Sequence, residues 1–246
     1  MNSPCLYLNF HHDLQELLKK NQAGQIVKYA LTRRASLKDI IESLGIPHTE
    51  VAQIFLKNKE LDFCFIPVGG EEIDIFAFSD KRSAFSSTLL RPQPSSPLKF
   101  MVDVNVQKIA RNLRLIGIDT TMVPDLHLVE IGEVAAREHR ILITRNRELL
   151  KCNSVIHGNL VRSENHGIQL QEVLKRYRLK SQIRPFARCI ACNGDLHSIS
   201  KNAIFDRLEP LTQKYFNTFK LCNNCGKIYW QGSHHKQLCQ FVDKVR

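Results

Sequence analysis

The sequence predicts a mixed α/β chain of three parts: a small N-terminal sheet domain, a parallel α/β domain and a small cysteine-bearing C-terminal domain. Three observations favour this organisation. A run rich in proline and serine divides the chain, strands alternate with helices after that run, and two Cys-x-x-Cys pairs follow. We place the boundaries at 1–80 for the first domain, 81–98 for the linker, 99–182 for the α/β domain and 183–246 for the last part with its tail.

Composition excludes several classes of protein. Of the 246 residues, 43% are apolar and 24% are charged, which is ordinary for a globular protein. The uncharged apolar runs are much shorter than the roughly 20 residues of a membrane helix. The first ten residues lack the basic and apolar regions of a signal peptide. We therefore expect no membrane partner and a cytoplasmic location.

The positive charge is confined to the second half of the chain. There are 35 Lys and Arg against 24 Asp and Glu, a net charge of +11. Residues 1–97 carry 11 of each sign, so residues 98–246 hold all of the excess. Such asymmetry favours a polyanion as the partner of that half. A basic domain without a nucleic-acid ligand fits the charge equally well.

The N-terminal domain reads as short strands around one main helix. Ser36 and Asp39 form a capping-box pattern that begins this helix, and Gly45 followed by Pro47 ends it. A shorter helix is expected at 13–20. Gly69 and Gly70 mark a turn inside the chain. Apolar runs predict strands at 5–10, 25–31, 51–56, 61–65 and 73–78.

After the linker, strands and helices alternate. Strands are expected at 100–104, 120–123, 140–144 and 155–160, and helices at 106–116, 126–138, 147–150 and 168–177. This order implies a parallel sheet covered by helices on both faces. In such sheets a ligand site lies at the carboxyl ends of the strands.

Polar side chains gather at these expected strand ends. Carboxylates there would repel one another unless Mg²⁺ or Mn²⁺ neutralised them, and such an ion can promote phosphodiester cleavage. Acidic residues in the first turn of a helix also interact with its dipole, which is the simpler explanation for any one of them. The candidates are Asp103, Asp125, Glu130, Glu133, Asn146 and Glu148, with Asp103 and Asp125 as metal ligands. The basic candidates for holding a phosphate backbone are Lys108, Arg111, Arg114, Arg145 and Arg147.

Cys189, Cys192, Cys222 and Cys225 form two pairs, each closely followed by glycine. Two such knuckles supply the four ligands of a structural zinc site, so we predict a zinc ribbon. Trp230 and His234 follow the second pair. They are candidates for stacking on a base and contacting phosphate, although a tryptophan packed against the ribbon is the structural alternative.

Two stretches resemble known families. The run from Ser36 to Val51 resembles the ubiquitin-like β-grasp domain that precedes Mut-seven C-terminal RNase domains. Met101-Val102-Asp103, the segment Ala110 to Thr120 and the run Ile141 to Leu149 resemble that RNase family itself, a variant of the PIN-like fold. The likeness extends to the Tyr-Trp-x-Gly-Ser-His ending, so it covers about residues 5–236. It implies a metal-dependent ribonuclease in which Asp103 matches the first-strand aspartate and Asp125 the acidic loop position.

One residue departs from the family pattern. Asn146 stands where the family usually has aspartate, so a negative ligand is missing, and Glu148 two residues later is a candidate to compensate. The leading hypothesis is therefore a metal-dependent ribonuclease acting on RNA. The alternatives are an RNA-binding protein without catalysis, or an adaptor whose β-grasp domain recruits a protein partner.

Overall fold

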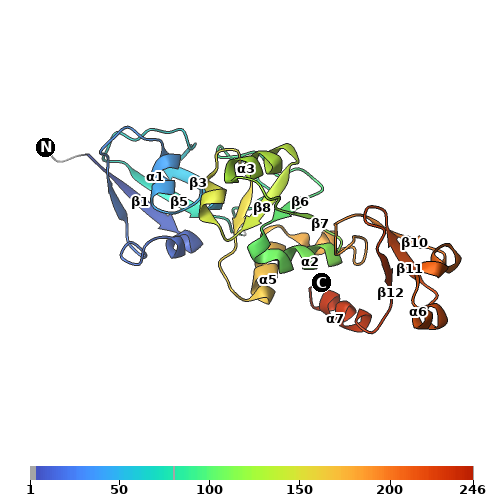
Figure 1. The fold of residues 1–246 in the computed structure, drawn as a ribbon. Coiled ribbons are helices and arrows are strands. Elements are labelled where there is room, and N and C mark those ends of the chain that lie inside the picture. Colours follow the sequence, from blue (N-terminus) through green and yellow to red (C-terminus); the bar gives the residue numbers. More distant parts are fainter. Residues whose placement is uncertain (1–3, 80, 246) are drawn as a thin grey trace. The chain divides into compact units, whose positions relative to one another are not determined.

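The computed structural model describes residues 4–79 and 81–245 (Figure 1). Residues 1–3 and 80, which belong to the predicted N-terminal domain, lie outside the described residues, as does residue 246 at the end of the predicted tail. The chain forms two compact units, each made of two stretches. The first combines Met1–Pro97 with Pro124–Arg162, and the second combines Leu98–Val123 with Ser163–Arg246.

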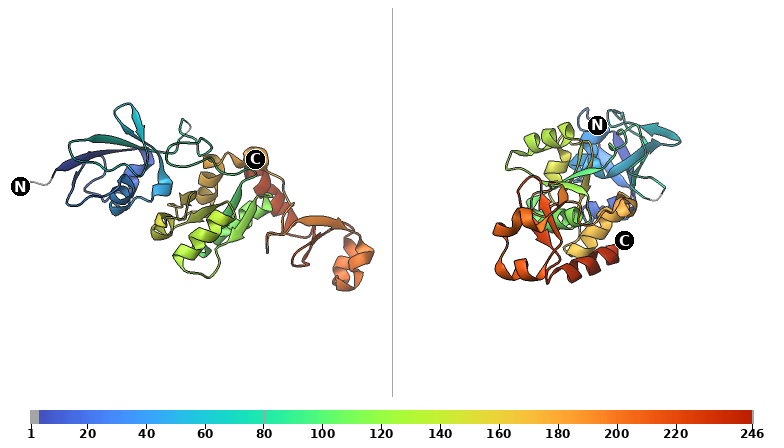
Figure 2. Two further views of the ribbon diagram at one scale, coloured as in Figure 1. Left: turned by 90° about the horizontal axis from the view of Figure 1, so that it is seen from above. Right: turned by 90° about the vertical axis from the view of Figure 1, so that its right-hand side faces the viewer.

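The first unit begins with a five-stranded sheet in the order β2-β1-β5-β3-β4. Strand β1 runs parallel to β5 and antiparallel to β2, while β3 is antiparallel to β5 and β4. Helix α1 (Leu37–Ser43) lies against this sheet (Figures 1 and 2). Its residues Leu37, Ile40 and Ile41 are fully buried. The strands are β1 (Cys5–His11), β2 (Val27–Ala30), β3 (Val51–Leu56), β4 (Lys59–Leu61) and β5 (Glu72–Ala77).

The predicted capping box of α1 is confirmed, because the Ser36 hydroxyl accepts from the Asp39 amide and the Asp39 carboxylate accepts from the Ser36 amide. The strand predicted at 61–65 is wrong for most of its length. The carbonyls of Phe63 and Phe65 instead accept from the Lys38 and Leu37 amides. These amides at the start of a helix lack partners within it, so this segment completes the cap.

The helix predicted at 13–20 is a 3-10 helix, η1 (His12–Leu17). Leu14 and Leu17 are buried three residues apart, a spacing that the three residues per turn of a 3-10 helix place on one side. Leucine spacing alone therefore located the helix but not its type.

Parallel strand pairs confirm the predicted parallel α/β character of the second domain. Strands β8 and β9 pair in the first unit, and β6 and β7 pair in the second. The first unit contributes α3 (Leu128–Arg137), β8 (Arg140–Thr144), α4 (Arg147–Lys151) and β9 (Gly158–Leu160). The second unit contributes β6 (Lys99–Val102), η3 (Val104–Val106), α2 (Gln107–Leu115), β7 (Asp119–Met122), α5 (His166–Arg176) and η4 (Leu179–Gln182).

Within the first unit, the 3-10 helix η2 (His48–Glu50) packs against β9 and α4. The His48 Nε2 atom lies 2.8 Å from the Val155 carbonyl, and the buried Glu50 carboxylate accepts from the Leu160 amide at 2.8 Å. The sequence Pro-His-Thr-Glu thus has a structural role. It joins the N-terminal sheet to the β8–β9 segment through polar contacts that are largely buried.

The linker is also attached to this unit. Arg91 is buried, and its guanidinium donates to the carbonyls of His48, Thr49 and Val51. Hydrogen bonds to a charged donor are stronger than neutral ones. The proline-rich stretch that was predicted as a spacer is therefore anchored at Arg91.

The C-terminal part contains a three-stranded antiparallel sheet in the order β10-β11-β12. Ile204, Leu208 and Phe219 form its small core. Helix α7 was not anticipated. The elements are β10 (Leu196–Ile199), η5 (Lys201–Arg207), α6 (Pro210–Tyr215), β11 (Phe219–Cys222), β12 (Ile228–Trp230) and α7 (His235–Val245). Over residues 4–79 and 81–245, no helix is both long and apolar enough to cross a membrane.

Candidate functional site

Asp103 lies directly after β6 in the second unit. The residue is 8% exposed and its side chain accepts from the Asn105 amide, so Asp103 caps η3. Strand β7 runs parallel to β6, and the Val123 amide donates to the Val102 carbonyl. The carboxyl ends of both strands therefore meet beside Asp103, which is where the sequence placed a ligand site.

The other predicted carboxylates belong to the first unit and are exposed. Asp125 lies before α3, and Glu133 lies on it. Glu130 accepts a hydrogen bond from the His127 amide at 3.0 Å, which caps the start of α3. Glu130 thus has the capping role that the simpler explanation assigned to acidic residues at helix starts.

Asn146 begins α4 as its N-cap. Its Oδ1 atom accepts from the Glu148 amide at 3.0 Å and from the Leu149 amide at 3.3 Å. The backbone amide of Asn146 donates to the hydroxyl of the buried Thr144. Since a carbonyl oxygen has two lone pairs, the Asn146 oxygen is fully used by the cap and only a donor group remains. Glu148 is exposed and pairs with Lys151 at 2.8 Å.

The predicted basic residues divide into two groups. Lys108 and Arg111 on α2 are exposed, as is Arg145 after β8. The structure does not support phosphate contacts by Arg114 or Arg147. Arg114 is 5% exposed and its guanidinium donates to backbone carbonyls, and Arg147 donates to the carbonyls of Leu17 and Gly45.

Arg147 instead ties α4 to the N-terminal domain. We expect Arg147→Ala to lower the free energy of unfolding by about 2 kcal/mol, because two carbonyls lose a charged donor. Chemical denaturation measures this change. The control is Glu148→Gln on the same helix, which removes only the ion pair of an exposed carboxylate with Lys151 and should stay within about 0.5 kcal/mol of the parent. Equal effects of the two substitutions would contradict the role given to Arg147.

The four predicted zinc ligands come together. The sulfurs of Cys189, Cys192, Cys222 and Cys225 all lie within 4.8 Å of one another. The Cys189–Cys225 and Cys192–Cys222 separations are 3.7 and 3.4 Å. Sulfurs bound tetrahedrally at about 2.3 Å from zinc lie roughly 3.8 Å apart. The cluster therefore fits a closed metal site with four sulfur ligands.

The surroundings of the cluster favour a thiolate at Cys192, whereas, against the lowering effect of the Lys227 amide, hydrogen bonding to Cys192 raises the pKa of Cys225. Although burial opposes it, hydrogen bonds from the Gly194 amide and from the Cys222 thiol lower the pKa of Cys192 to about 6. A side chain at Gly194 would collide with Cys222 and Asn224. The Tyr229 hydroxyl lies 3.0 Å from the Cys189 sulfur. Because thiolates are the form that binds metal, the chain around the cluster suits zinc.

Two polar side chains hydrogen-bond the first Cys-x-x-Cys knuckle to helix α2 and strand β7 of the second unit. Arg114 donates from α2 to the carbonyls of Ile190 and Ala191, which lie between the first two cysteines. Asn193 accepts from the Thr120 amide and donates to Asp119. Sequence reasoning missed Asn193, and its place directly after Cys192 was the only available signal.

Trp230 and His234, the remaining predicted contacts to RNA, line one pocket beside the ribbon. Trp230 is 40% exposed, so the indole is not packed away in the ribbon core. His234 is exposed as well.

Comparison with known protein families gave two matches. A model of the Mut7-C RNAse domain matches residues 98–242, and a model described as Mut7-C ubiquitin matches residues 3–82. No curated protein and no solved structure matches the chain. The two matches occur in the order that the sequence motifs predicted.

Proposed function

The chain belongs to the family of the Mut7-C RNAse domain, and from this we propose that it is a divalent-metal-dependent ribonuclease that hydrolyses phosphodiester bonds of RNA. The observation that carries the proposal is Asp103, a largely buried carboxylate directly after β6 in the RNase domain. Two exposed basic side chains, Lys108 and Arg111, lie on α2, the α-helix that follows Asp103 in the sequence.

We propose Asp103 and Asp125 as the ligands of Mg²⁺ or Mn²⁺. Both are carboxylates, which these hard cations prefer. A bound ion would polarise the phosphate and lower the pKa of an attacking water. Lys108, Arg111 and Arg145 are the basic side chains that would hold the phosphate backbone of the RNA in place.

RNA cleavage with added Mg²⁺, Mn²⁺ or no divalent ion tests this proposal, with Asp103→Asn as the comparison. Asparagine caps a helix as well as aspartate does, so the variant should fold while losing the charged ligand. We expect metal-dependent cleavage by the parent and only background by the variant. Equal cleavage by the parent and by Asp103→Asn would contradict the proposal that this chain is a nuclease.

The family match does not favour the alternative of RNA binding without catalysis, but Asn146 keeps that alternative as a second proposal. Its oxygen is used in the helix cap, so the chain lacks one candidate metal ligand. RNA binding without cleavage is the function that this feature supports. Salt-dependent binding by a parent that does not cleave would establish it.

The adaptor hypothesis has less support. One face of the ubiquitin-like domain, formed by η2, already contacts the β8–β9 segment. A protein partner for its other surfaces stays a prediction, as does the cytoplasmic location. A thiolate metal site needs reduced cysteines, which supports that location.

A further inference from the structure

The net positive charge of the protein is concentrated in the second unit. That unit has 18 basic and eight acidic residues, whereas the first unit has 17 basic and 16 acidic ones. Between Glu172 and Asp195 the chain contains six basic residues and no acidic one. This stretch begins in α5 and continues through η4. Charge asymmetry on this scale favours a polyanion as the partner of the second unit.

Six exposed basic side chains lie on two neighbouring helices of this unit and on the segment that follows them. Helix α2 packs against α5, and η4 also packs against α5 (Figure 1). We call the six residues the α2–α5 basic surface. They are Lys108 and Arg111 on α2, Lys175 on α5, and Arg178, Lys180 and Arg184 after α5.

The α2–α5 basic surface starts close to Asp103 in the chain and extends away from it. Asp103 caps η3, and α2 follows η3 directly. At the other end of α2, the Arg184 amide donates to the Ile116 carbonyl at 2.8 Å. Helix α2 has nine residues and is therefore about 13 Å long. The surface thus leads from the proposed catalytic carboxylate to the far end of this helix.

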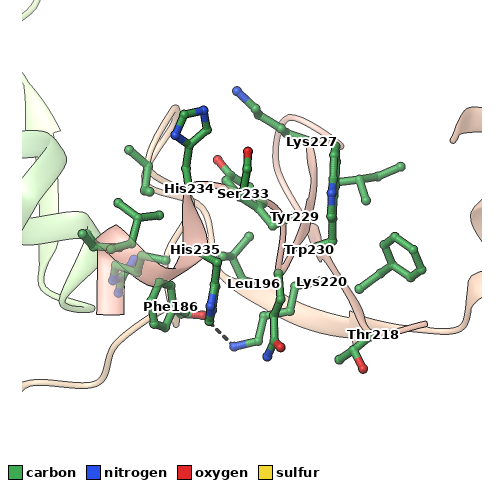
Figure 3. Close-up of a pocket in the computed structure, with 18 residues that line it drawn as sticks. Phe186, Leu196, Thr218, Lys220, Lys227, Tyr229, Trp230, Ser233, His234 and His235 are labelled. Atoms are coloured by element: carbon green, nitrogen blue, oxygen red, sulfur yellow. Dashed lines mark hydrogen bonds between the residues drawn. The ribbon is translucent and has the colours of Figure 1, made fainter. Parts of the chain in front are cut away.

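The side chains of the α2–α5 basic surface are unpaired. Over residues 4–79 and 81–245, none of the six forms an ion pair or a side-chain hydrogen bond. Arg188 of the same unit, by contrast, forms ion pairs with two aspartates. The Lys220 ammonium donates to the Phe186 carbonyl at 2.7 Å (Figure 3). The charges of the basic surface are therefore available to an external anion.

The helix dipole explains only part of this pattern. Cations near the end of a helix are favourable, which accounts for Lys175 and Arg178 at the end of α5. Lys108 lies in the first turn of α2, where the dipole opposes a positive charge. Neither α2 nor η4 contains an aromatic residue on which a base could stack. The surface is therefore suited to phosphate groups and not to bases.

We infer that the α2–α5 basic surface binds the phosphate backbone of RNA without regard to base sequence. The inference rests on the proposed action on RNA and deepens it, because it assigns a path for the substrate beyond Lys108 and Arg111. Contacts of Lys and Arg with phosphates fix the position of a nucleic acid but carry no sequence information. The surface therefore holds RNA of any sequence on the path that leads to Asp103.

Fluorescence anisotropy of a labelled, unstructured oligoribonucleotide measures binding to the full-length Asp103→Asn protein over a range of salt concentrations. The test variant adds Lys175→Gln, Arg178→Gln and Lys180→Gln. Each lost contact with a single strand lowers the salt slope by about 0.7 and the affinity by about fivefold at about 0.1 M salt. We therefore expect the slope to fall by about two and the affinity to fall by about a hundredfold.

A second triple variant of Asp103→Asn is the matched control. It adds Lys20→Gln, Lys59→Gln and Arg137→Gln, which replace three exposed basic residues of the first unit. The net charge of the chain changes by the same amount, but we expect the salt slope and the affinity to stay those of Asp103→Asn. Equal losses in the two triple variants would show that overall charge binds RNA and would overturn the inference. An unchanged slope in the test variant would overturn it as well.

Arg178→Gly separates RNA binding from helix stability. The Arg178 φ angle is 46°, in the left-handed region that favours glycine at the end of a helix. We expect this substitution in Asp103→Asn to weaken RNA binding about fivefold without lowering the melting temperature. A lower melting temperature with unchanged RNA affinity would assign Arg178 to the helix end and contradict its part in the surface.

These outcomes are distinct from those of the cleavage assay. Weaker binding by the test variant, in a chain whose parent never cleaves RNA, would retain the surface and contradict the nuclease proposal. Cleavage by the parent, with equal RNA affinities of Asp103→Asn and the test variant, would contradict the surface alone. Oligoribonucleotides of different sequence should bind with similar affinity. Binding to vesicles of phosphatidylserine and phosphatidylcholine but not to RNA would assign the surface to a membrane and overturn the inference.

Discussion

Cys192→Ser is expected to lose zinc and to unfold the sheet of β10, β11 and β12. Three sulfurs cannot close the tetrahedral site, and zinc binding contributes roughly 10–16 kcal/mol in zinc-finger peptides. The core beneath the sheet is small, with Ile204, Leu208 and Phe219 as its buried members. Domains of this size often depend on a metal for stability.

The effect should spread beyond the ribbon. Arg114 donates to the carbonyls of Ile190 and Ala191, and Asn193 binds both Thr120 and Asp119. If the first knuckle unfolds, the buried Arg114 guanidinium loses two acceptors. An unsatisfied buried charged group costs several kcal/mol, so α2 and β7 should also lose stability.

Zinc content, limited proteolysis and thermal unfolding measure these changes. The control is Cys239→Ser, because Cys239 lies in the same unit but outside the cluster. We expect the control to keep its zinc and resist cleavage within 183–246, and the Cys192 variant to do neither. Retained zinc in the Cys192 variant would contradict the assignment of the four cysteines.

Local patterns predicted local structure well. The capping box at Ser36 and Asp39, the strand at 140–144 and the clustering of the four cysteines all depend on residues whose spacing fixes their geometry. Helix α7 carried a comparable signal, since the buried Val242 and Val245 lie three residues apart.

The spacing of residue types along the sequence could not predict the long-range contacts. Arg114 and Arg147 resemble solvent-facing arginines in the sequence, yet their acceptors are carbonyls up to 130 residues away. A backbone carbonyl has no residue identity, so no motif marks it. Asn146 is a different case, because its helix-cap bonds are local: the sequence placed it among the candidate catalytic residues, and its oxygen is used by the cap.

Asn146→Asp is expected to raise metal-dependent RNA cleavage by at least about tenfold, provided that Asn146 lies at the catalytic centre. Replacing a metal's supporting groups typically changes affinity or activity tenfold to a hundredfold. In aspartate, one carboxylate oxygen can keep the bonds from the Glu148 and Leu149 amides. The second oxygen then stands in place of the Asn146 NH₂ group, which is a donor and cannot bind a cation.

The substitution should not disturb the fold, because aspartate is as good an N-cap as asparagine and its charge favours a helix start by about 0.3–1 kcal/mol. The chain offers a matched control in Asn165, whose side chain caps α5 by accepting from the Gly167 and Ile168 amides at 2.9 and 3.3 Å. Asn165→Asp should give the same small stability gain without a change in cleavage.

Initial cleavage rates measured over a range of Mn²⁺ concentrations distinguish the possible causes. If Asn146→Asp supplies a ligand, the metal concentration for half-maximal cleavage falls, and adding Asp103→Asn to this variant abolishes the gain. If the two Asn→Asp variants accelerate cleavage equally, helix capping explains the change and Asn146 is not part of the metal site. If neither variant cleaves RNA, a missing charge at Asn146 does not account for the inactivity, and the family's nuclease chemistry has been lost elsewhere in this chain.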